Sequence, residues 1–166
     1  MSLGMYDVWI NQDFIIPDYI FIKQRLIDQF KQTWRSNIDR SDKLVLFKSF
    51  KIDFDFDRYL DLIQVDKYRI MLTRLKLSSH NLAIETGRYH NVPQNMRLCQ
   101  YCNMNVIENE YHFLLVCPLY RDLRKQLFKK YYCHWPNIHK LNSLLSQTSQ
   151  TGLTKLGKYI FLAFKF

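Results

Sequence analysis

Glycine and proline are scarce in this chain of 166 residues, with four of each. Both residues are typical of tight turns, so their scarcity argues against a turn-rich sheet and favours long helices with short connections. Hydrophobic residues make up 48% of the sequence and aromatic residues 16%, which is enough to bury a core. Disorder of the whole chain is therefore excluded, and the length suits one domain or a core with an appendage.

The sequence also lacks a long apolar run. Its best candidate, residues 159–164, is flanked by Lys158 and Lys165 and is too short to span a bilayer. The first apolar stretch is interrupted by the polar residues 11–13, and no cationic segment precedes it, which argues against a secretory signal. We therefore expect an intracellular protein, nuclear or cytoplasmic, without a membrane partner.

Acidic residues are few in the second part of the chain. Residues 1–60 hold nine basic and nine acidic side chains, whereas residues 61–166 hold fifteen basic and six acidic ones and so carry the whole formal charge of +9. A cationic part beside a neutral part favours contact with a polyanion, although a merely solubilising surface charge is the plain alternative.

Apolar residues at helical spacing predict a mainly α protein. The first helix is expected after Pro17, with Asp18 as its cap and a stripe from Tyr19 to Trp34. Further helices are expected over 41–50, 59–77 with a break at Asp66, 108–116, 118–132, 137–147 and 153–166. An ordered loop is expected over 78–97. The strict alternation of residues 51–57 predicts one short extended segment, in which three aspartates form either a solvent face or a divalent-metal site.

Cysteine and histidine fall into one spacing that is typical of a zinc site: Cys99, Cys102, His112 and Cys117. Two cysteines separated by two residues can hold one ion from a single tight turn, and the five-residue offset of His112 and Cys117 lets both converge where a helix ends at Pro118. Three thiolates and one imidazole give closed tetrahedral coordination. We predict a structural zinc ion stapling this loop.

Other interpretations of these residues stay open in the sequence. The cysteine pair could be a redox dithiol, although no thioredoxin-type pattern precedes it. Cys133 and His134 could replace one ligand, form a second site, or simply be a partly buried thiol and its neighbour. Catalytic zinc keeps an open position for water, which four protein ligands do not leave. Glu108 and Glu110 flank the site, and we expect them to form a solvated helix face.

The same stretch carries a family resemblance. Residues 74–80 (Arg-Leu-Lys-Leu-Ser-Ser-His), 84–89 (Ile-Glu-Thr-Gly-Arg-Tyr), 97–99 and 108–120 occur in the order found in the tails of non-LTR (LINE-type) retrotransposon reverse transcriptases. The chain resembles that carboxy-terminal zinc-binding region over roughly residues 66–135. The resemblance implies accessory RNA or DNA binding during target-primed reverse transcription, with a reverse transcriptase domain as partner. Because no Asp-Asp dipeptide holds polymerase metal ions here, it implies no polymerase activity, and a truncated mobile-element copy is an alternative.

Basic side chains surround the zinc segment in sequence, and they are candidates for phosphate contact. They are Arg74, Lys76, Arg88, Arg97, Arg121, Arg124, Lys125, Lys129 and Lys130. Tyrosines are interleaved with them, and stacked rings would suit single-stranded RNA or nicked DNA, although most of these tyrosines are expected in the core. Arg88 either contacts phosphate or pairs with Glu85. His80 is expected to brace the zinc loop, Gly87 to adopt a conformation other residues avoid, and the tryptophans to be core or interface anchors.

These observations predict a non-enzymatic, zinc-binding, nucleic-acid-binding accessory module. We expect an amino-terminal helical region (1–65), a zinc-binding module (66–135) and carboxy-terminal helices (136–166). The alternative is a protein-interaction or structural appendage that uses the apolar stripe around Ile22, Leu26 and Phe30.

Overall fold

Residues 16–165 are described by the computed structural model, with side chains from Tyr19 onward. In this part of the chain the secondary structure is helical apart from one isolated antiparallel bridge between Leu98 and Ile107. The prediction of a mainly α protein is therefore confirmed. The chain divides into two compact units, Met1–Ser41 and Asp42–Phe166.

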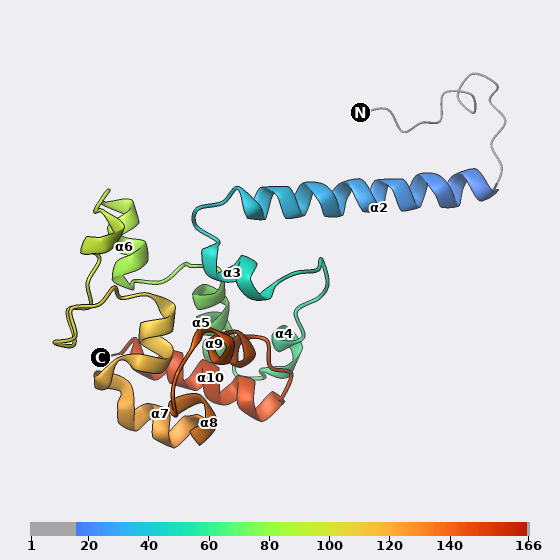
Figure 1. The fold of residues 1–166 in the computed structure, drawn as a ribbon. Coiled ribbons are helices and arrows are strands. Elements are labelled where there is room, and N and C mark those ends of the chain that lie inside the picture. The colour runs from blue at the N-terminus through green and yellow to red at the C-terminus, as the bar shows by residue number, and fades with distance from the viewer. Residues whose placement is uncertain (1–15, 166) are drawn as a thin grey trace. The chain divides into compact units, whose positions relative to one another are not determined.

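The first unit is built on one long helix, α2 (Ile16–Asp39), which is drawn in blue in Figure 1. The helix begins before Pro17, so Asp18 lies inside the first turn and does not precede it as a cap. Several large apolar side chains of α2 are about half exposed, among them Tyr19 (56%), Leu26 (51%) and Phe30 (56%). Trp9 lies outside the described residues.

The second unit contains the remaining helices. The α-helices are α3 (Val45–Phe50), α4 (Tyr59–Leu62), α5 (Asp66–Lys76), α6 (Ala83–Tyr89), α7 (Arg121–Leu127), α8 (Lys130–Cys133), α9 (Ile138–Leu145) and α10 (Gln150–Ala163). Two 3-10 turns, η1 (Gln94–Met96) and η3 (Pro118–Tyr120), and one π-helical turn, η2 (His112–Val116), complete it.

The bounds of several predicted elements differ from those in the structure. The break at Asp66 is confirmed, because α4 ends at Leu62 and α5 begins at Asp66. The expected loop over 78–97 contains helix α6, and the expected helix over 118–132 is divided into η3, α7 and α8.

The extended segment expected over residues 51–57 is a loop wrapped around Lys51. The ammonium of this buried lysine binds the backbone oxygen and carboxylate of Asp55 and lies 3.3 Å from the carboxylate of Asp57. Two of the three alternating aspartates therefore pair with one lysine. The prediction of a strand is wrong, because contacts with Lys51 and not a strand ladder hold this segment.

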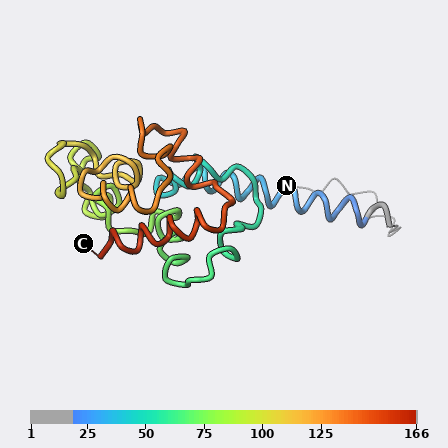
Figure 2. The backbone as a smooth tube through the Cα atoms, turned by 90° about the horizontal axis from the view of Figure 1, so that it is seen from below, coloured from blue at the N-terminus to red at the C-terminus, as the bar shows by residue number. Residues whose placement is uncertain are grey.

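Helix α10 forms the centre of the second unit. It buries Leu153, Leu156, Tyr159 and Ile160 against the neighbouring helices and packs along α5 (Figure 2). The two helices approach so closely at Gly157 that a Cβ atom there would lie 2.7 Å from the carbonyl oxygen of Tyr68. The carboxy-terminal helix and residues 66–76 therefore share one core. Among the described helices, none has the length and apolarity required to cross a membrane.

Candidate metal centre

Cys99 and Cys102 lie on a tight turn that is closed by backbone hydrogen bonds. The Cys99 amide donates to the carbonyl of Val106 (2.9 Å), and the Glu108 amide donates to the carbonyl of Arg97 (2.9 Å). These bonds form the short antiparallel bridge of the fold. Asn105 takes a left-handed conformation (φ 55°) that asparagine tolerates, which lets the chain reverse within a few residues.

His112 and Cys117 are brought together by the π-helical turn η2. The Cys117 amide donates to the carbonyl of His112 (2.7 Å), a bond spanning five residues that wraps one ligand back over the other. Asn109 fixes the start of this turn, because its side-chain oxygen accepts from the His112 amide (2.8 Å). Pro118 then opens η3. The predicted convergence at the end of a helix is confirmed, with a π-turn as its geometry.

The two arms meet in one cluster. One ligand atom from each of Cys99, Cys102, His112 and Cys117 lies within 4.8 Å of the others. The Cys102 sulfur lies 3.4 Å from Nε2 of His112. Cys99, His112 and Cys117 are buried and Cys102 is half-buried. This group can hold a metal ion, as the spacing predicted.

Burial opposes charge on these ligands when no cation is present. It raises the pKa of Cys99 to about 12, even though a hydrogen bond from the Tyr101 amide acts in the opposite direction. Burial likewise raises the pKa of Cys117 and, together with the charge of Arg124, lowers the pKa of His112. A bound cation would favour the thiolates and the neutral imidazole, which are the ligating forms.

The two glutamates beside the cluster, Glu108 and Glu110, are buried. The expectation that they form a solvated helix face is therefore wrong. Glu108 accepts from the Ala83 amide (2.7 Å) and from the Cys99 thiol (3.8 Å), and burial raises its pKa. Glu110 lies 3.1 Å from Nε2 of His80, whose Nδ1 in turn accepts from the Leu82 amide (3.4 Å). Together these contacts tie the metal segment to His80 and to the first residue of α6, Ala83, which is consistent with the bracing role predicted for His80.

The Arg97 side chain binds backbone carbonyls next to the metal cluster. Its guanidinium donates to the carbonyls of Ile84 and Val92, both at 2.9 Å, and so holds α6 against the cysteine turn. Gly87 gives this side chain room, since a Cβ there would lie 2.6 Å from Cγ of Arg97. The absent side chain is thus required for space, and not for an unusual backbone angle.

Arg124 is buried, with 5% exposure. The prediction that it contacts phosphate at the surface is therefore wrong. Its Nη2 donates to the carbonyls of Val116 (3.2 Å) and Cys117 (2.6 Å), while Nη1 has no hydrogen-bond partner. None of the ion pairs among residues 16–165 gives it a carboxylate partner. A buried guanidinium beside a cysteine ligand is therefore a second feature of the centre that spacing alone did not indicate.

Cys133 and His134 are not part of the cluster. Cys133 is half-buried, burial raises its pKa, and His134 is exposed at the end of α8. The interpretation of Cys133 as a partly buried thiol is the one that the geometry supports.

Lys76 is also buried, with 5% exposure, and its prediction as a phosphate ligand is corrected. Its ammonium lies 4.2 Å from the ring centroid of Tyr59 and 4.8 Å from that of Phe50, beside a cleft of about 430 Å³. Desolvation lowers its pKa from 10.5 to about 8, although the charge of Asp57 acts in the opposite direction. The folded state therefore holds the charged form of Lys76 less readily than the unfolded chain does.

We expect Lys76→Met to stabilise the protein at pH 7. The pKa difference of Lys76 corresponds to a penalty of about 3 kcal/mol for folding with the charged amine. Loss of the cation–π contacts offsets part of it, so the net gain is about 1 to 2 kcal/mol. Because the folded pKa is the lower one, the penalty is complete below pH 8 and fades as the pH approaches 10.5. Urea unfolding of both proteins at pH 7 and pH 10 measures this, and an equal difference at both pH values would contradict it.

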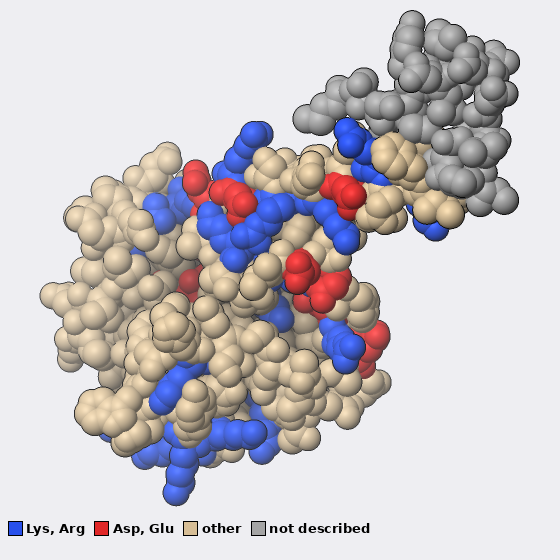
Figure 3. Space-filling view, turned by 45° about the vertical axis from the view of Figure 1, so that its right-hand side comes forward, with Lys and Arg blue, Asp and Glu red and all other residues tan. Residues whose placement is uncertain are grey.

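The remaining predicted cations are on or near the surface. Arg74, Arg121, Lys125, Lys129 and Lys130 are exposed. Four of these belong to α7, α8 and the turn between them, and Figure 3 shows Lys and Arg side chains gathered over the lower end of the second unit, where those helices lie. Arg88 is half-buried and pairs with Glu85 at 3.0 Å, so of its two predicted roles the ion pair is the one formed.

Comparison with known proteins gives no relative: no family model, no curated protein and no solved structure matches this chain.

Proposed function

We propose that the ion held by Cys99, Cys102, His112 and Cys117 is zinc and that it is structural. Zn–S and Zn–N bonds of about 2.3 and 2.0 Å place a sulfur and a nitrogen about 3.5 Å apart across a tetrahedral ion. The Cys102 sulfur and His112 Nε2 lie 3.4 Å apart before any ion is considered. Thiolate-rich sets also favour zinc over calcium and magnesium, which prefer oxygen ligands. Four protein ligands leave no open position for a catalytic water.

Around this zinc we propose an accessory module that binds RNA or DNA and has no polymerase activity of its own. The observation that carries the proposal is the exposed cationic surface of Arg121, Lys125, Lys129 and Lys130, which follows directly on the ligand Cys117. We refer to these four residues as the α7–α8 basic surface. Its single close ion pair, Lys125 with Asp122 at 3.5 Å, is solvent-exposed and weak. The likeness of residues 66–135 to reverse transcriptase tails supports the same function and makes a reverse transcriptase domain a proposed partner.

Substitution of the α7–α8 basic surface by glutamine at all four positions tests this function. We expect weaker binding to single-stranded oligonucleotides, and a slope of log K against log salt that is shallower by up to about 3, since each lost phosphate contact removes about 0.7. Fluorescence anisotropy between 50 and 300 mM salt measures both quantities on RNA and on DNA.

The matched control removes four cations from α2: Lys23, Arg25, Lys31 and Arg35. It changes the net charge equally but leaves α7 and α8 intact. Equal loss in both variants would mean that only net charge matters, and salt-independent binding by the unmodified protein would contradict the proposed function.

A second candidate function is protein interaction through α2, because Tyr19, Leu26 and Phe30 expose about half of their surface. This candidate predicts self-association or capture of a partner helix. Light scattering that gives a monomer mass at high concentration, unchanged by Leu26→Glu, would argue against self-association.

A further inference from the structure

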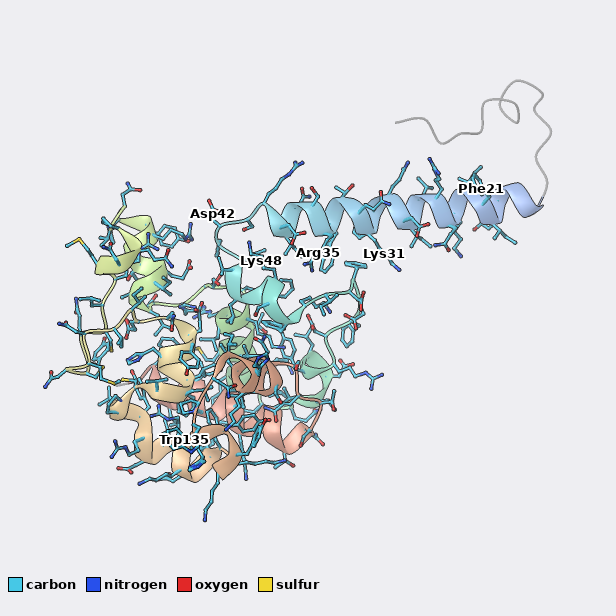
Figure 4. All side chains as sticks on the ribbon, viewed as in Figure 1. Phe21, Lys31, Arg35, Asp42, Lys48 and Trp135 are labelled. Atoms are coloured by element: carbon cyan, nitrogen blue, oxygen red, sulfur yellow. The ribbon has the colours of Figure 1, made fainter. Side chains whose placement is uncertain are left out.

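The sequence predicts that Trp135 anchors either the core or an interface. The side chain is 78% exposed, the most of any large apolar residue among the described side chains, so it does not anchor the core. It lies beside α8 at the lower end of the second unit (Figure 4). Its backbone is left-handed, with φ 48°, a conformation that bulky residues adopt rarely and with strain. Because the Trp135 side chain is exposed, burial of apolar surface does not offset the strain of its backbone. We therefore infer that contacts of the neighbouring residues hold this turn in place.

Those contacts tie the tryptophan turn to the metal centre. The Tyr111 hydroxyl donates to the carbonyl of Pro136 (2.9 Å), and Tyr111 directly precedes the ligand His112. On the other side, the Lys140 ammonium donates to the carbonyl of His134, and the Asn137 side chain caps α9 by accepting from the Lys140 amide (3.0 Å). The turn is therefore fixed at both ends.

A second exposed ring lies beside this turn. Tyr131 is 58% exposed, and its ring lies 4.6 Å from the Lys140 ammonium that binds the turn. Lys129 and Lys130 immediately precede Tyr131 and are exposed. From residue 123 to the end of the chain the sequence contains no Asp or Glu, so no acidic side chain of α8, α9 or α10 counters these lysines. Exposed rings in a purely cationic stretch complement a polyanion that carries flat apolar groups.

We propose that Trp135 and Tyr131 form a stacking platform for the unpaired bases of single-stranded nucleic acid, with Lys129 and Lys130 contacting the adjacent phosphates. This inference rests on the proposed function and assigns its base-contacting residues. Unpaired bases have free faces, whereas the bases of a duplex stack on one another and leave a ring at the surface nothing to cover. Stacking on every base alike makes the platform tolerant of sequence.

The test compares Trp135→Ala and Trp135→Phe with the unmodified full chain, using fluorescence anisotropy with oligo-dT, oligo-U and a duplex of the same length. Loss of one stacked base is expected to weaken binding to both single strands roughly 5- to 150-fold. Phenylalanine retains a ring and should restore most of the affinity. The salt slope should stay unchanged, because stacking removes no phosphate contact. Tyr89→Ala is the matched control, since Tyr89 on α6 is 67% exposed and should bind no base.

The possible results distinguish the stacking platform from the proposed nucleic-acid-binding function on which it rests. Unchanged affinity of Trp135→Ala, with salt-dependent binding retained, would overturn the platform and leave the basic surface standing. Absence of binding by the unmodified chain even at low salt would overturn both. Equal affinity for the duplex would overturn the single-strand assignment, and loss of self-association without loss of oligonucleotide affinity would identify the surface as a protein interface. Because the side chain is exposed, the thermal midpoint should not move in any variant.

Discussion

We expect Cys102→Ser to abolish metal binding and to unfold the segment from Arg97 to Tyr120, whereas Cys133→Ser should leave both the metal content and the fold unchanged. The two thiols are similarly placed, each half-buried, but Cys133 lies outside the ligand cluster. Structural zinc contributes roughly 10 to 16 kcal/mol of apparent binding free energy at neutral pH. That is as large as the whole stability of an ordinary domain, about 5 to 15 kcal/mol, so few folds of this size could lose it.

The unfolding should spread beyond the metal segment because that segment forms part of the main core. Phe113 is 1% exposed, stacks on Phe164 at 4.9 Å and contacts the rings of Tyr120 and Tyr159. The Tyr159 hydroxyl, buried in α10, donates to the carbonyl of Phe113 (2.7 Å). Release of the π-turn would therefore expose apolar surface on α10 as well.

Native mass spectrometry with and without a chelator, beside thermal unfolding followed by circular dichroism, measures this prediction. One zinc per chain is expected in the unmodified protein and in Cys133→Ser, and none in Cys102→Ser. A metal-free protein with an unchanged melting curve would show that the four residues are not a metal centre and would contradict the proposed structural zinc.

We expect Arg124→Gln to lower the affinity for the proposed zinc ion by about 10- to 100-fold, the range typical of residues just outside the ligand set. Arg124→Lys should lose much less affinity. Three thiolates and one divalent ion leave the centre with a net charge of −1. Arg124 supplies a buried positive charge that donates to the carbonyl of the ligand Cys117. An unpaired buried charge is strongly destabilising, and the proposed metal-bound thiolates would supply a counterion for this guanidinium.

The pair of variants separates charge from hydrogen bonding. Glutamine keeps an amide donor but loses the charge, whereas lysine keeps the charge and loses the planar fork. Competition with a chromophoric chelator gives the affinities, and cobalt(II) absorption reports whether the ligand set remains tetrahedral. Equal affinity losses in both variants would mean that Arg124 acts through its hydrogen bonds and not through its charge.

Much of this protein is determined locally by its sequence. The spacing of Cys99, Cys102, His112 and Cys117 predicted the metal cluster, because ligands three and five residues apart are joined by short turns whose geometry depends on few neighbours. Helical periodicity predicted the fold class, and Asp66 predicted a helix break, for the same reason. The alternation over 51–57 misled, because alternation of polar and apolar residues also arises when a loop closes around one cation such as Lys51.

Tertiary structure alone decided which side chains are used internally and which face outward. Lys76 and Arg124 look in sequence like Lys125 and Lys130, but the first is covered by rings from α4 and the end of α3 and the second lies against the metal turn. Glu108 and Glu110 are buried for a similar reason, since the Ala83 amide donates to Glu108 and His80 pairs with Glu110. Trp135 is held outward by Tyr111 and Lys140 through its neighbours. In each instance the deciding contact comes from a residue distant in the chain, or from a turn that periodicity does not encode, so the burial of a charge or a ring emerges only when the helices pack.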